Sequence, residues 1–274
     1  MNNDQKIKAV IFDWAGTMVD YGCFAPLDVF ISVFKNRGID LTIKEARRPM
    51  GLKKIDHIKK ILKMKRINKL WQKKYSEEPD EQDVINIYQE FKKKLLKILP
   101  DYSRPIPGAL QLVDFLKSND IKIGSSTGYT SDMMKVLVPA AARKGYQVDC
   151  LVTSSDVPGG RPYPWMCYQN ALKLQIYPMY RIVKVGDTVN DIKAGINAGV
   201  WSVGVILGSS ELGLSKEEVE NSDPNRLKDK VAEVRKKYKE AGAHYVIDTI
   251  SDLEDIINDI NKKLPLLPPF PNWN

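Results

Sequence analysis

Four short segments of this chain end in side chains that can bind or attack a phosphoryl group. The first is an apolar run, 9–12, that leads directly into Asp13 and then into a Gly-Thr pair at 16–17. Such a run followed by a turn predicts a buried strand that delivers a carboxylate to a loop. A carboxylate in that position is a candidate nucleophile for phosphoryl transfer. Two residues later stands Ala15, whose side chain cannot donate a proton to a leaving group.

The other three segments add hydroxyl, cationic and acidic groups. Thr127 and Gly128 end a second apolar run, and they offer a hydroxyl and a flexible backbone amide to a phosphoryl oxygen. Arg161 follows a third run, and Pro162 directly after it is able to open a helix. The fourth run ends in two acids spaced i and i+4, Asp187 and Asp191.

In an open parallel sheet, ligands bind outside the carboxyl ends of the strands, so we expect the four segments to form one site. Asp13 and Asp187 supply hard oxygen ligands suited to Mg²⁺, and Asp191 is placed to orient a metal-bound water. Thr127 and Arg161 can neutralise phosphoryl oxygens, the arginine through two parallel hydrogen bonds. Taken singly, each residue has a simpler explanation as a helix cap, a turn or a surface cation. All four segments in this order favour a single phosphoryl site.

Short apolar runs alternate with longer helical patterns through most of the chain. This alternation predicts an α/β fold, a doubly wound, Rossmann-like parallel sheet with helices on both faces. The expected strands cover 8–14, 121–127, 149–154, 181–187, 201–206 and 243–249. The expected helices cover 108–119, 131–144, 163–174, 189–198, 229–241 and 251–262.

The interval 21–100 interrupts this alternation. Its amphipathic helical patterns cover 25–37, 44–64, 67–75 and 81–98. We expect an inserted helical cap domain at 21–100, on a core domain formed by 1–20 and 101–263. A Pro-rich tail, 264–274, ends the chain.

The order and spacing of the phosphoryl-binding residues resemble the haloacid dehalogenase-like hydrolases, whose signature is Asp-x-Asp-Gly-Thr. The resemblance implies that Asp13 forms an aspartyl-phosphate, that Thr127 binds the phosphoryl group, and that Arg161 stands where the family usually has lysine. It also implies that Mg²⁺ is held by Asp187 and by the backbone carbonyl of Ala15. In that family the second Asp of the signature protonates the leaving oxygen of a phosphate ester. Because Ala15 occupies its place, either the chain is a weak phosphatase or its leaving group is not an alcohol.

A carbon leaving group needs an electron sink, and a lysine imine supplies one. The cap holds two adjacent candidates, Lys53 and Lys54. On a continuous helix over 44–64, Met50, Lys54 and His57 share one face, and nearby cations would help to keep the amine neutral. If the second acid of the signature were present instead of Ala15, the simpler interpretation as exposed helix lysines and a surface or satisfied histidine would be preferred.

Longer stretches resemble one branch of these hydrolases, the phosphonoacetaldehyde hydrolase family. The match covers about residues 7–260 and is carried by 13–26, 48–57, 127–130, 160–166 and 185–188. The resemblance implies hydrolysis of the C–P bond of phosphonoacetaldehyde to acetaldehyde and phosphate, in 2-aminoethylphosphonate degradation. It selects Lys54 over Lys53 for the Schiff base, with His57 or a water as a proton shuttle. It also places Cys23, Met50 and His57 near the substrate aldehyde. It further implies an Mg²⁺-dependent homodimer joined through the caps.

Two rival functions are weighed against this one. A phosphate-ester phosphatase or sugar-phosphate mutase on the same fold requires an acid at position 15, which the chain lacks. A non-catalytic anion-binding protein predicts erosion of the metal site, yet every acid of that site is present.

Composition narrows the setting of the protein. The 274 residues contain no apolar run of about 20 residues that would span a bilayer. Three cysteines without metal-type spacing, and no apolar signal region at the N-terminus, favour a cytoplasmic location. The net charge of +8 is concentrated in 44–100, with 17 Lys and Arg against 8 Asp and Glu. This excess either attracts a small anion or, as we expect for most of it, reflects solvated helix faces. No helix-turn-helix, zinc or RNA-recognition motif is found, so we expect no nucleic-acid partner; the small-molecule phosphonate substrate is what the family resemblance implies.

Overall fold

The parallel sheet expected from the sequence is present. In the computed structural model, residues 6–264 are described, and they contain six parallel strands in the order β3-β2-β1-β4-β5-β6. The strands are β1 (Ala9–Phe12), β2 (Lys122–Thr127), β3 (Cys150–Thr153), β4 (Ile182–Gly186), β5 (Trp201–Val205) and β6 (Tyr245–Ile247). Chain order reverses at β1, between β2 and β4, which is where a doubly wound sheet binds its ligands.

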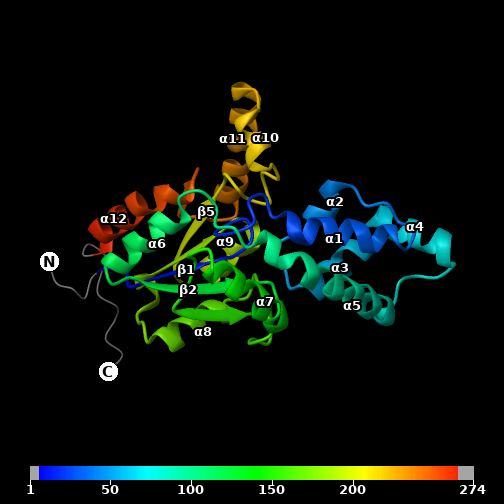
Figure 1. Cartoon of the computed structure of the whole chain (residues 1–274), viewed down its shortest axis with the longest axis horizontal. Coiled ribbons are helices and arrows are strands. Elements are labelled where there is room, and N and C mark those ends of the chain that lie inside the picture. The colour runs from blue at the N-terminus through cyan, green and yellow to red at the C-terminus, as the bar shows by residue number, and fades with distance from the viewer. Residues whose placement is uncertain (1–5, 265–274) are drawn as a thin grey trace.

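Helices cover both faces of the sheet (Figure 1). They are α6 (Ala109–Ser118), α7 (Ser131–Ala142), α8 (Trp165–Leu174), α9 (Val189–Asn197), α10 (Lys216–Glu220), α11 (Pro224–Glu240) and α12 (Leu253–Lys263). Val10 and Phe12 of β1 belong to the apolar cluster that includes α6 and α12, whereas Ala9 and Ile11 pack against α8. Because both faces of β1 are buried, its sequence is apolar at every position instead of alternating.

The first five helices after β1 lie beyond the carboxyl end of that strand (Figure 1). They are α1 (Phe24–Lys35), α2 (Ile43–Arg47), α3 (Lys54–Leu62), α4 (Lys65–Tyr75) and α5 (Glu81–Ile98). α5 packs along both α1 and α3, and the rings of Phe30 and Phe91 stack where α1 meets α5. The helices predicted for this interval are therefore present, with one exception.

The continuous helix predicted over 44–64 is wrong. The chain leaves the helix after Arg47 and forms a turn before it enters α3 at Lys54. Pro49 has no amide hydrogen to donate within a helix, and Gly51 adopts a left-handed φ of 84°. Met50 lies in this turn, so it does not share a helical face with Lys54 as predicted.

Smaller differences concern the helix starts. Pro162 does not open a helix, because α8 begins at Trp165 with Pro164 as its N-cap. α11 begins at Pro224, five residues before the predicted start, with Asp223 as its N-cap. The predicted tail from 265 onward lies outside the described residues. Within 6–264, every helix is too short or too polar to cross a lipid bilayer.

Candidate active site

A small cavity lies where the carboxyl ends of β1, β2 and β4 face the turn before α3. Its wall includes these residues predicted from the sequence: Asp13, Ala15, Cys23, Met50, Lys54, Thr127, Gly128, Arg161 and Asp187. The other two predicted residues, His57 and Asp191, are buried behind the wall. Sequence analysis did not assign the remaining lining residues, which are Gly51, Tyr129, Thr188 and Ser210. The fold therefore gathers residues from the strand ends and from the segment between β1 and the start of α3 around one cavity.

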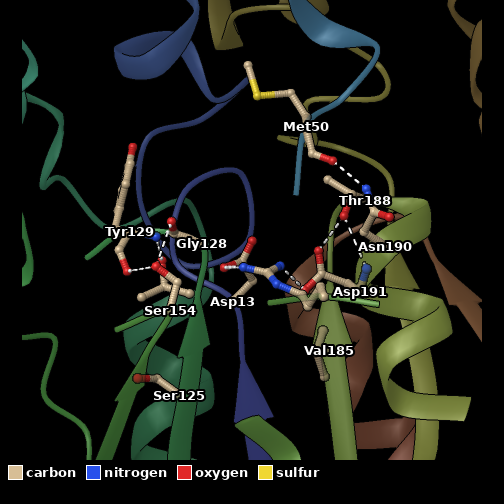
Figure 2. Close-up of polar contacts among 12 residues, drawn as sticks. Asp13, Met50, Ser125, Gly128, Tyr129, Ser154, Val185, Thr188, Asn190 and Asp191 are labelled. Carbon is tan, nitrogen blue, oxygen red and sulfur yellow. Dashed lines mark hydrogen bonds and ion pairs between the residues drawn. The ribbon is translucent and has the colours of Figure 1, made fainter. Parts of the chain in front are cut away.

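Asp13 is held at the end of β1 by the sheet and by an ion pair. Its amide donates to the carbonyl of Val185 at 3.0 Å, which continues the β1–β4 ladder one residue beyond the strands. Arg161 Nη2 donates to Asp13 Oδ1 at 2.9 Å, and Arg161 Nη1 donates to Asp191. The arginine thus bridges two buried carboxylates, one of which reaches the cavity (Figure 2).

Asp191 has both carboxylate oxygens engaged behind the cavity. Oδ1 accepts from Arg161 and, at 2.6 Å, from Lys184; Oδ2 accepts from the Thr188 hydroxyl at 2.5 Å. Burial alone would raise the pKa of Asp191, but Arg161 and Lys184 outweigh it and hold that pKa below its ordinary value. Lys184 was missed, although a lysine inside the apolar run of β4 signals a buried charge that must be paired.

Asp187 carries the chemistry expected of a cation ligand. Ser210 donates its amide to Asp187 Oδ2 at 2.8 Å, while Oδ1 is buried without a hydrogen-bond partner. Burial, together with the neighbouring charges of Asp13 and Asp191, raises the pKa of Asp187 well above its ordinary value. These three carboxylates offer ligand atoms within 4.8 Å of one another. A bound cation would relieve their repulsion and partner the orphaned oxygen, so the residues fit a metal ion.

The loop after β2 is held by hydrogen bonds between side chains and the backbone of Tyr129. Thr127 Oγ1 accepts from the amide of Tyr129 at 3.1 Å. Ser154 Oγ lies 3.0 Å from the carbonyl oxygen of Tyr129 and donates a hydrogen bond there (Figure 2). The Tyr129 hydroxyl is buried without a partner, and burial raises its pKa well above the ordinary value. The loop therefore presents a neutral phenol and a fixed threonine to the cavity.

Lys54, the first residue of α3, is buried with only 5% of its surface exposed. Its Nζ lies 5.0 Å from the ring centroid of Tyr129 and 5.9 Å from that of Phe30. Burial lowers the pKa of the amine, and Arg161 lowers it further, against the opposing effects of Cys23, Asp13 and Asp187. Lys53, in contrast, is half-buried and does not line the cavity. The structure therefore distinguishes two adjacent lysines that the residues alone did not.

His57 lies one helical turn behind Lys54 and is fully buried. Its Nε2 lies 2.8 Å from the carbonyl of Ala46, so Nε2 carries the proton and donates. Nδ1 is buried without a partner, and the ring stacks on Phe30 at 4.0 Å. Burial and the charge of Lys54 hold the pKa of His57 well below its usual range. The alternative interpretation as a surface histidine is wrong.

The turn at 48–53 contacts the loops after β2 and β4 at positions where glycine leaves room. A Cβ on Gly51 would collide with the Thr188 hydroxyl, and one on Gly128 would lie 2.7 Å from the carbonyl oxygen of Leu52. Asn190 Nδ2 donates to the carbonyl of Met50 at 2.7 Å (Figure 2). Only residues without a side chain allow the turn to lie this close to the Thr188 side chain and to the backbone at Gly128.

Comparison with known proteins agrees with this geometry. The family model of the haloacid dehalogenase-like hydrolases matches the sequence of residues 7–199. Phosphonoacetaldehyde hydrolase of Bacillus cytotoxicus is 56% identical over 94% of this chain and 98% of its own length. A bifunctional phosphonoacetaldehyde hydrolase/aminoethylphosphonate transaminase of Clostridioides difficile is 57% identical over 94% of this chain, which spans only 41% of that relative.

Solved structures show the same fold. A phosphonoacetaldehyde hydrolase-like protein of Oleispira antarctica superposes with a TM-score of 0.94 at 36% identity, covering 97% of this chain and 96% of that one. A β-phosphoglucomutase of Clostridium difficile superposes with a TM-score of 0.66 at 20% identity, covering 95% of this chain and all of that one. The second likeness concerns the fold alone.

Proposed function

Since the chain belongs to the haloacid dehalogenase-like hydrolases and, within them, to the phosphonoacetaldehyde hydrolase family, we propose that it hydrolyses phosphonoacetaldehyde to acetaldehyde and phosphate. One observation carries this proposal. A buried lysine and a strand-terminal aspartate line the same cavity, and Ala15 occupies the position where a phosphatase needs an acid. The relatives' names supply the substrate, and the cavity supplies groups for both halves of its chemistry.

The phosphoryl half of the reaction belongs to the strand ends. Asp13 attacks phosphorus and forms an aspartyl-phosphate, which water then hydrolyses. Arg161, already within hydrogen-bond distance of Asp13, is placed to bind the phosphoryl oxygens as they approach that carboxylate. Thr127 and the backbone amide of Gly128 complete the cradle on the β2 side.

The carbon half belongs to the turn and α3. Lys54 condenses with the aldehyde, because its lowered pKa makes the neutral, nucleophilic amine more available than in an ordinary lysine. His57 Nδ1, a buried lone pair behind the lysine, is suited to accept a proton during this condensation. The thioether of Met50 and the thiol of Cys23, whose pKa burial raises well above its usual value, line the aldehyde's end of the cavity as neutral groups.

The leaving group explains Ala15. When the C–P bond next to a protonated imine breaks, its electron pair moves into the C=N group and a neutral enamine leaves, so no acid is needed at position 15. Protonation of the enamine carbon and hydrolysis of the imine then release acetaldehyde. An alkoxide leaving from a phosphate ester would require that acid. The phosphatase and mutase alternative therefore lacks its proton donor in this chain.

We assign the metal as Mg²⁺, held by Asp13, Asp187 and the backbone carbonyl of Ala15. When bound, it would neutralise charge on the transferring phosphoryl oxygens. Asp191 has no free carboxylate oxygen, so it acts on the metal's surroundings through Arg161 and Thr188.

Entry of substrate requires movement of α1–α5, which we treat as the cap within 21–100. Lys54 is buried, and the cavity has a volume of about 20 Å³, room for roughly one water molecule. Opening at the turn admits the substrate, and closure excludes water from the imine. A homodimer joined through the caps is part of the proposal and rests on the family resemblance, whereas a cytoplasmic location rests on the three cysteines without metal-type spacing.

Borohydride trapping tests the function most directly. Incubation with phosphonoacetaldehyde and borohydride should fix a covalent adduct on Lys54, located by peptide mass spectrometry. Lys53→Arg should leave the adduct intact, whereas Lys54→Arg should abolish it and reduce turnover by about 10³-fold or more. An adduct on Lys53, or none at all, would refute the imine assignment, since neither rival function forms an imine.

A further inference from the structure

A second depression, of about 640 Å³, lies on the outer side of the turn that walls the active-site cavity. Pro49 and Leu52 line this outer groove, whereas Met50 and Gly51 between them line the cavity. The core side shows the same relation, because Pro162 and Asn190 line the groove next to Arg161 and Thr188 of the cavity. One turn of backbone therefore separates the two spaces.

Among residues 6–264, one side-chain hydrogen bond joins the turn at 48–53 to the core side of this partition. Asn190, which lines the groove, donates to the carbonyl of Met50, whose side chain lines the cavity (Figure 2). Movement of the turn away from the core would break this bond and join groove and cavity. The groove thus lies at the entrance that cap opening would create.

The groove has cations and no acid in its wall. They are Arg48, Lys60, Lys63 and Lys65, all exposed. Among residues 6–264, none of these four forms an ion pair or a side-chain hydrogen bond, although Lys59 beside them pairs with Glu81. Unpaired like charges around a concave surface create a positive potential that concentrates anions.

Lys65 is the most informative of the four. It is the first residue of α4, where the helix dipole disfavours a positive charge. α4 has no acidic residue in its first turn and no side-chain cap. Lys65 lowers the stability of its own helix and lines the groove. A residue that breaks a local stability rule in this way indicates a role elsewhere, here in the groove.

We propose that this groove captures the phosphonate group of the substrate before the turn opens and delivers it to Asp13 and Arg161. The ligand class is a small phosphonate or phosphate anion, and its link to turnover rests on the proposed function. Part of the excess of positive charge in 44–100 then serves to bind this anion, and the rest lies on solvated helix faces.

The test compares two charge reversals at the same helix position. Lys65→Glu removes a groove cation, whereas Lys216→Glu reverses the first residue of α10, outside the groove. At 10 mM salt we expect kcat/KM for phosphonoacetaldehyde to fall about three-fold in Lys65→Glu, and about ten-fold when Lys60→Glu is added, with kcat unchanged. The control should match wild type, and all variants should converge at 0.5 M salt.

A second measurement separates this inference from the proposed function. Methylphosphonate has no aldehyde, so its binding, measured by calorimetry at 10 mM salt, involves no turnover. Both charge reversals leave the cavity residues intact, so a difference between the two variants reports on the groove. We expect Lys65→Glu to bind it about three-fold more weakly than wild type and Lys216→Glu to bind it equally. Equal binding by both variants overturns the capture site. Absence of turnover in wild type, with the binding difference intact, instead refutes the proposed substrate and leaves the anion site standing.

Discussion

The strand ends and the turn at 48–53 both wall the cavity, but they hold their side chains by different means. Asp13 continues a ladder hydrogen bond of β1 and is joined to Arg161 and Asp191 by buried ion pairs. The turn is attached to the core by the Asn190–Met50 hydrogen bond and by close glycine contacts. A ladder within a buried sheet opens only with the fold, whereas a turn with few contacts opens locally. We therefore expect the phosphoryl half of the site, at the strand ends, to be rigid and the imine half, at the turn and α3, to be movable.

Removing the nucleophile should have the largest effect, because nothing else in the rigid half can replace it. Asp13→Ala should lower phosphate release by about 10⁴-fold or more, as losses of covalent nucleophiles do. Borohydride trapping on Lys54 should survive in this variant, since imine formation depends on the other half of the site. Phosphate release measured alongside adduct yield checks both statements. Retained turnover would refute covalent catalysis at Asp13, and loss of both would show that the two halves are not separable.

The movable half should respond to a change of closure without a change of chemistry. Gly51→Ala puts a methyl group into the Thr188 hydroxyl and strains a φ of 84°. Gly145→Ala is a matched control, because its φ of 95° is strained similarly while its Cβ would meet only Leu110, at 3.4 Å.

We expect both alanine variants to lose about 1–2 kcal/mol of unfolding free energy from the left-handed backbone. Only Gly51→Ala should lower kcat/KM, by about 10- to 100-fold, because the turn can no longer close against the core. Urea unfolding and steady-state kinetics provide the two readouts. Equal kinetic losses in the two variants would mean that closure at Gly51 has no special part in catalysis.

The same contrast explains what the sequence could predict. Buried parallel strands are near-continuous apolar runs, so their ends, and with them Asp13 and Asp187, could be located without a structure. The turn could not, because the helical pattern over 44–64 continues through it, and Pro49 with Gly51 was the available signal of a break. Burial of His57 was also unpredictable, since it depends on packing between α1 and α3.

Partners of the buried charges form a third class. Lys184 was visible as a charged residue within an apolar strand, which calls for a buried counter-charge. Its partner Asp191, seven residues away, could not be identified, because that contact depends on how α9 packs on β4. Sequence therefore predicted which residues carry chemistry better than which residues neutralise them.

The smallest expected effect is a shift in the pH dependence of imine formation. It tests whether the charge of Asp13, in the rigid half, changes the pKa of Lys54, in the movable half. Imine formation requires the neutral amine, so its rate rises with pH up to the pKa of Lys54. Burial lowers that pKa below the ordinary 10.5. The rising limb of the pH–rate profile should therefore level off below pH 10.5. The negative charge of Asp13 opposes this shift, so Asp13→Asn should move the limb to still lower pH. Borohydride trapping of acetaldehyde, which needs no phosphoryl transfer, measures the limb in both proteins. A limb that moves to higher pH in Asp13→Asn would show that the carboxylate does not act on the amine across the cavity, and that the rigid and movable halves meet only through the substrate.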